Sequence, residues 1–186
     1  MAITLAERRE RNIVAAMVRT AIKRSGREVK DISSTCGISS SALYYAQGGK
    51  KDVPLKASRK FSGVNLIAAA SIAARFTGLY WLFRYRFSDR HVLARVVELQ
   101  HYDKMADEAT NAMPELLFNK NSRQDLTTDD EKKLEEVAVK LADRMNCTFN
   151  LLMELDSRYN LNLVKVFDEQ NKKAARSERV AFQGVK

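Results

Sequence analysis

Apolar residues recur at helical spacing along most of the chain, and no alternating run of β-branched residues competes with them. From about residue 5 to 24 they step by three and four, and Ser25-Gly26 then supplies a helix stop. Shorter helices are predicted over about 28–35 and up to Gln47, with Ser39 as the N-cap of the second. Only seven glycines and two prolines punctuate the chain. The pattern predicts an all-α protein.

The C-terminal half carries a second set of helical signals. Ser88, followed by Asp89, is expected to cap a helix with a wide apolar stripe over 92–99. Residues 116–127 break the pattern and are predicted to be a linker. Thr128 and Glu131 have the spacing of a capping box, which predicts a helix over 128–170. The polar residues 171–186 are expected to form a flexible tail.

Within the predicted helix over 128–170, apolar residues step by four and three, the period of a coiled-coil seam. This period favours self-association, while packing onto residues 88–113 of the same chain is the alternative. Val137, Phe149 and Leu151 widen the stripe toward a bundle. The predicted oligomerisation residues are Leu134, Ala138, Leu141, Met145, Leu152 and Leu155.

The segment VKDISSTCGISSSALYYAQG has the spacing of a helix-turn-helix that reads DNA. Such a unit needs a small residue where the two helices touch, here Ser33, and a glycine in the turn, here Gly37. Its apolar supports would be Ile32, Cys36, Ile38, Leu43 and Ala46. With these buried, the second helix is expected to present Ser39, Ser40, Ser41, Tyr44, Tyr45 and Gln47 to base edges and phosphates.

The two tyrosines leave an alternative open. Tyr44 and Tyr45 form either an aromatic pair packed on the following helix or a surface that faces DNA, because tyrosine suits both environments. Tyr44 is the better candidate for DNA contact.

The downstream segment SGVNLIAAASIAARFTGLYWLF carries a further pattern through Ser62, Asn65, Leu66, Ala70, Thr77, Trp81 and Leu82. Together with the helix-turn-helix spacing, it resembles the phage repressor and Cro type of DNA-binding protein, the XRE family, over about residues 9–84. The resemblance implies a five-helix, lambda-repressor-like domain. Ser40 stands where that family usually has glutamine, and the connection after Gln47 is longer than the family's.

Charge supports a nucleic-acid partner for the first half only. The chain carries a net charge of +9, and residues 1–100 hold 18 basic and 7 acidic side chains against 14 and 16 in the remainder. The loop after Gln47 gathers expected phosphate contacts, although a solvated insertion is the alternative. These residues are Lys50, Lys51, Lys56, Arg59 and Lys60. Arg8, Arg9 and Arg11 form either a DNA-contacting arm or a solvated helical turn.

Other classes of function find little support. Cys36 and Cys147 stand too far apart for a zinc motif or disulfide framework, and His91 and His101 lack a third ligand at metal spacing. No cofactor and no enzyme activity are expected. The start of the chain lacks a signal-peptide core, and the apolar stretch 61–83 is expected to be buried helix rather than a membrane span. A cytoplasmic protein of a bacterial or phage-infected cell is expected.

The sequence therefore predicts a sequence-specific regulator that binds double-stranded DNA as a homo-dimer or higher oligomer. Residues 1–86 would form the DNA-binding domain, 87–115 a connecting helix, 116–127 a linker and 128–170 the oligomerisation segment. One alternative is a protein-interaction module, antitoxin-like or binding a polymerase or phage factor through its C-terminal helix. Another is a binder of RNA or single strands that stacks bases on Tyr44 and Tyr45.

Overall fold

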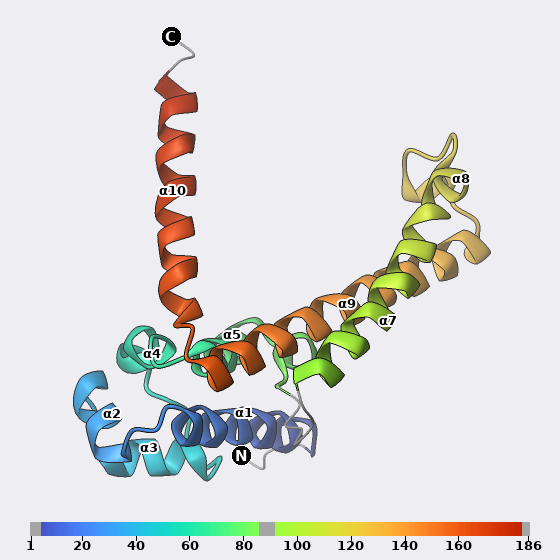
Figure 1. Cartoon of the computed structure of the whole chain (residues 1–186). Coiled ribbons are helices and arrows are strands. Elements are labelled where there is room, and N and C mark those ends of the chain that lie inside the picture. The colour runs from blue at the N-terminus through green and yellow to red at the C-terminus, as the bar shows by residue number, and fades with distance from the viewer. Residues whose placement is uncertain (1–4, 86–91, 184–186) are drawn as a thin grey trace.

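In the computed structural model, all regular elements among residues 5–85 and 92–183, the described part of the chain, are helical. Side chains are described for 8–85 and 92–174. The all-α prediction is confirmed. Figure 1 shows a body formed by the N-terminal helices, an arm made by two long helices, and a last helix that projects away from both. The elements are α1 (Leu5–Arg24), α2 (Val29–Cys36), α3 (Ser40–Gln47), α4 (Leu55–Ser62), α5 (Leu66–Thr77), α6 (Tyr80–Phe83), α7 (Val92–Asn111), α8 (Met113–Leu117), the 3₁₀ turn η1 (Arg123–Asp125), α9 (Thr128–Tyr159) and α10 (Leu163–Gln183).

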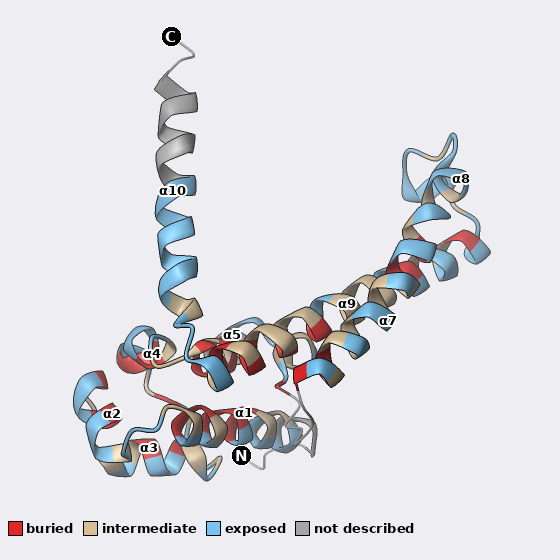
Figure 2. Ribbon diagram, viewed as in Figure 1, coloured by how far each residue is buried: buried red, intermediate tan, exposed pale blue. Residues whose placement is uncertain are grey.

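The body is built around α1, which packs mainly on α5. The apolar stripe of α1 supplies Met17, Val18 and Ala21 to one core, and Phe61 and Ile67 enter it from the opposite side. Figure 2 shows this buried surface on the facing sides of α1 and α5. The predicted end of α1 is confirmed, since Gly26 takes a left-handed φ of 65° directly after the helix. The predicted cap at Ser88 and Asp89 lies outside the described residues.

Helix α4 corrects the prediction of one long lysine-rich loop after α3. The loop spans 48–54 only, and Lys56, Arg59 and Lys60 lie on a helix. The helix forms because Pro54 occupies its N-cap position and Ala57, Ser58 and Phe61 give it a narrow buried face. The basic side chains occupy the opposite, exposed face.

The start of α9 is displaced by one residue from the prediction. Thr127, not Thr128, is the N-cap, and its hydroxyl accepts from the Asp130 amide at 3.2 Å. The Asp130 carboxylate in turn accepts from the Thr127 amide at 2.9 Å. Asp130 rather than Glu131 completes the capping box because it stands three residues after Thr127, and it also makes a 2.7 Å ion pair with Lys120. These bonds hold the pKa of Asp130 well below its usual range.

Helix α9 packs along α7 for most of its length. This matches packing onto residues 88–113 of the same chain, the alternative to self-association for the 128–170 segment. The C-terminal half of α9 then continues onto α5 and α6. Met153 is fully buried in the same core as α1–α5, with Phe149 and Leu152 packed against it. The body thus contains residues from both ends of the sequence.

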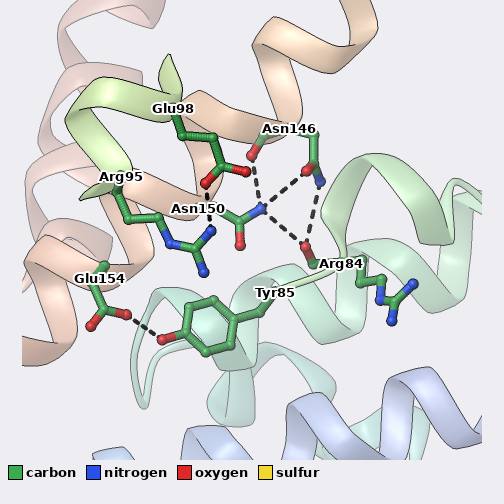
Figure 3. A network of polar contacts seen from close by, with 7 residues as sticks. All are labelled: Arg84, Tyr85, Arg95, Glu98, Asn146, Asn150 and Glu154. Atoms are coloured by element: carbon green, nitrogen blue, oxygen red, sulfur yellow. Dashed lines mark hydrogen bonds and ion pairs between the residues drawn. The ribbon is translucent and has the colours of Figure 1, made fainter. Parts of the chain in front are cut away.

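A ladder of polar side chains, buried on α9, ties that helix to the short α6 (Figure 3). Asn146 donates through Nδ2 to the carbonyls of Trp81 and Leu82, each at 2.9 Å. One turn later, Asn150 donates to the carbonyl of Arg84 at 3.1 Å. These bonds satisfy carbonyls at the end of α6, a four-residue helix too short to be stable alone. The ladder therefore fixes α6 on the body.

Glu154, the next rung of this ladder, anchors Tyr85 (Figure 3). Its carboxylate accepts from the Tyr85 hydroxyl and from Arg158, and Arg24 of α1 lies 3.9 Å away. Burial alone would raise the pKa of Glu154, but the bonds from Tyr85 and Arg158 and the nearby positive charges lower it. Burial and the Glu154 contact raise the pKa of Tyr85 to about 12. The pair is therefore a charged carboxylate and a neutral phenol at neutral pH.

Asp156 completes the attachment of α9 to the body. Its carboxylate accepts from the amide of Leu66, the first residue of α5, at 3.1 Å and from the amide of Leu163, the first residue of α10, at 2.8 Å. Asn160, at a φ of 52°, ends α9. One buried side chain thus caps two helices.

Residues 171–183, predicted to belong to a flexible tail, are helical and continue α10. Gly and Pro are absent from this stretch, and Lys172 pairs with Asp168 one turn earlier at 2.8 Å.

Candidate nucleic-acid interface

Helices α2 and α3 are joined by a tight turn with the features that the sequence predicted. Gly37 caps α2 in the left-handed conformation at a φ of 69°, and Ser39 caps α3 by accepting from the Ala42 amide at 3.2 Å. Ser33 is buried where the helices meet, with its hydroxyl 3.0 Å from that of Ser40. The supports Ile32, Cys36, Leu43 and Ala46 are buried, and Ile38 is half-buried.

The predicted outer face of α3 is only partly available. Ser39, Ser41 and both tyrosines are exposed, Tyr44 to 58% and Tyr45 to 44%. Ser40 is half-buried because its hydroxyl faces Ser33. Its predicted role on the outer face is therefore corrected: it braces the turn.

Gln47 also differs from its prediction. It is half-buried, and its side-chain nitrogen has no partner among the described residues. The backbone carbonyl of Gln47 accepts from the guanidinium of Arg19, which lies on α1. Sequence reasoning missed Arg19, because nothing local in the sequence marks a contact between residues so far apart. Arg19 fixes the C-terminal end of α3 against the body.

The lysines after α3 lie beside Tyr45. The ammonium groups of Lys50 and Lys51 are 6.0 and 5.6 Å from the centre of its ring. The chain turns here through Gly49, which has a φ of 68°. A Cβ at this position would lie 3.5 Å from the Cβ of Ala15. Tyr45 therefore faces the lysines, and Tyr44 is the more exposed of the two tyrosines.

The remaining predicted basic residues lie on two other helices. Lys56, Arg59 and Lys60 are exposed on α4, and Arg8, Arg9 and Arg11 are exposed on α1. Burial raises the pKa of the Cys36 thiol. The nearby positive charges of Arg27 and Lys60 offset only part of this rise. Cys36 is thus an inert support rather than a reactive group.

None of the predicted oligomerisation residues is among the fully buried positions of α9, although Leu152 packs against the core of the body. Buried positions include Val137, Cys147 and Met153. The predicted Leu134, Leu141, Leu152 and Leu155 are half-buried, and Ala138 and Met145 are exposed.

Two further observations bear on chemistry. Among the side chains described, those of residues 8–85 and 92–174, no group of three or more from His, Cys, Asp and Glu is arranged to hold a metal ion. Within residues 5–85 and 92–183, none of the helices combines the length and apolarity needed to cross a membrane. Comparison with protein-family models, curated proteins and solved structures finds no match for this chain.

Proposed function

We propose that this protein is a sequence-specific regulator that binds double-stranded DNA, with α2 and α3 acting as a helix-turn-helix of the repressor and Cro type. The observation that carries the proposal is the exposed face of α3, which presents Ser41 and Tyr44 and is followed by a loop whose exposed lysines, Lys50 and Lys51, lie beside Tyr45. An α-helix fits the major groove, and hydroxyl and aromatic side chains can contact base edges and thymine methyl groups there.

Affinity and specificity are assigned to different residues. Lys50, Lys51, Lys56, Arg59 and Lys60 would contact phosphates and supply binding that is independent of sequence. Ser41 and Tyr44 would contact bases. Dimerisation or higher assembly would place two α3 helices on a two-fold symmetric site.

Selection of bound fragments from random duplex DNA tests the proposal with the full chain. Enrichment of a common motif, followed by a gel shift that prefers it over scrambled duplex, is the expected result. Binding should weaken steeply as salt rises. Failure to shift any duplex at low salt overturns the proposal, and preference for single strands at matched salt favours base stacking on the tyrosines instead.

A second candidate is a protein-interaction module, and the arm favours it. Helices α7 and α9 extend well beyond the body in Figure 1, and residues 98–144 hold twelve acidic and seven basic side chains. An acidic projecting surface suits a basic protein partner better than DNA. Substituting lysine for Glu135 and Glu136 distinguishes the two functions. The variant would lose capture of a basic protein partner and keep duplex binding.

A further inference from the structure

A groove of about 490 Å³ lies where α1, α6 and the middle of α9 meet, away from α3 and α4. Its lining is mostly apolar and includes Ile13, Leu79, Trp81 and Met145. Trp81 is 43% exposed and Met145 49% exposed. Large apolar side chains gathered around one groove are typical of a protein interface, and tryptophan is among the residues that contribute most to binding.

The buried ladder of α9 holds this surface rigid. Asn146 donates to the carbonyl of Trp81 and to that of Leu82, so the backbone that carries the exposed tryptophan is fixed from behind. A side chain presented from fixed backbone loses less entropy when it binds.

The charges of the groove indicate the occupant. Glu10 lines it from α1, and Arg84 lines it just after α6. A surface that carries one acid and one base beside an apolar centre is complementary to itself under a two-fold axis, because the acid of each copy meets the base of the other. The same groove contains Met145, a residue of the stripe whose period favours self-association.

We infer that the groove is a two-fold interface with a second copy of this chain, in which Trp81 of each copy enters the groove of the other and Glu10 pairs with Arg84 of the partner subunit. The role of this dimer rests on the proposed function, because the interface leaves both α3 helices free to bind DNA.

Trp81 is the single tryptophan of the sequence, so its fluorescence reports directly on the interface. In a dilution series of the full chain from micromolar to nanomolar, we expect its emission to move to longer wavelength as dimers separate. Sedimentation should give the same midpoint. A protein that is monomeric throughout the series, or whose emission is independent of concentration, overturns the inference.

Variants locate the interface. Met145→Asp should weaken the dimer at least about tenfold, because it places a charge in the apolar centre. Val139→Asp is the matched control: Val139 is also exposed on α9, to 60%, but lies outside the groove, and its variant should dimerise as the wild type does. Equal effects of the two substitutions overturn the inference.

A charge exchange gives a second test, in which Glu10 also gives up its contact with Tyr80 of the same chain. Glu10→Arg and Arg84→Glu should each weaken the dimer, and the double variant should recover it, because each copy then offers the reversed pair. Circular dichroism verifies that each variant is folded. Failure of the double variant to recover overturns the pairing. Duplex binding measured on the same samples keeps the two proposals apart. A monomer that binds DNA refutes this inference alone. A dimer that fails to bind DNA refutes the proposed function alone.

Discussion

The two halves of α9 are parts of one helix but interact with their surroundings in different ways. From 128 to 145, the helix packs on α7 and pairs its charges near the surface, as Lys133 does with Asp129 at 2.6 Å. From 146 to 159, it buries two asparagines and Asp156, which bond to the backbone of the body, and Glu154, which bonds to the Tyr85 side chain. Apolar periodicity identifies a helix that packs, but the buried polar residues determine what it is attached to.

The largest effect is expected from breaking the ladder in the inner half. Asn146→Leu should lower the free energy of unfolding by about 3 kcal/mol, because it leaves the carbonyls of Trp81 and Leu82 without their donor. In the outer half, Ala138→Leu on an exposed position should change it by less than about 0.5 kcal/mol. Urea denaturation of both variants tests the contrast, and similar losses would contradict it.

The pH dependence of stability should come from the inner half as well. The pKa of Glu154 is lower in the folded protein than its ordinary 4.5, so its contribution is present above pH 4.5 and lost as the pH falls. The pKa of Tyr85 is raised to about 12 from 10, so its contribution is present below pH 10 and lost between 10 and 12.

Glu154→Gln tests the acidic limb of this dependence. The variant should lose about 2 kcal/mol at neutral pH, because its bonds to Tyr85 and Arg158 no longer involve a charge. Its thermal midpoint should then fall less steeply than the wild type's below pH 4.5. Parallel acid profiles for the two proteins would show that other carboxylates dominate.

A smaller effect is expected on the salt dependence of DNA binding, which should respond to lysines of the body and not to lysines of the arm. Lys50→Ala with Lys51→Ala should reduce the slope of log affinity against log salt by about 0.9 per lost phosphate contact. Lys132→Ala with Lys140→Ala removes the same charge from the arm and should leave the slope unchanged. Filter binding over a salt series measures both. A response that follows total charge alone would contradict the assignment of the interface to the body.

The smallest effect is expected at the tip of the arm. Thr127→Ala removes the N-cap of α9 and should cost about 1 kcal/mol. The loss should appear as faster amide exchange in the first turns of α9, with the protection of α5 unchanged. Equal loss of protection in α5 would show that the two halves of α9 unfold together.

Local spacing was sufficient to predict some of these features. The ends of α1 and α3 and the buried Ser33 follow from caps and turn residues close in sequence. Helix α4 was missed because its basic residues hide the small buried face of Ala57, Ser58 and Phe61. The cap of α9 was misplaced because Thr127 and Thr128 each have an acid three residues later.

The asparagine ladder and the contact of Arg19 with α3 had no signal that sequence reasoning could use. Their partners are backbone carbonyls of distant segments, and any residue type can supply a carbonyl. The exposed face of α3 was also overestimated at two positions: Ser40 meets the hydroxyl of Ser33 in the preceding helix, and Gln47 is half-buried.

The double cap made by Asp156 has a consequence for synthesis of the protein. The body is discontinuous in sequence, because α5 receives a cap from a residue that follows the whole arm. On the ribosome, α1–α6 emerge long before residues 146–163, so the body completes its folding only when most of the chain has been translated. A gene fragment that ends at residue 86 would encode the proposed DNA-reading helix without the side chains that close its domain.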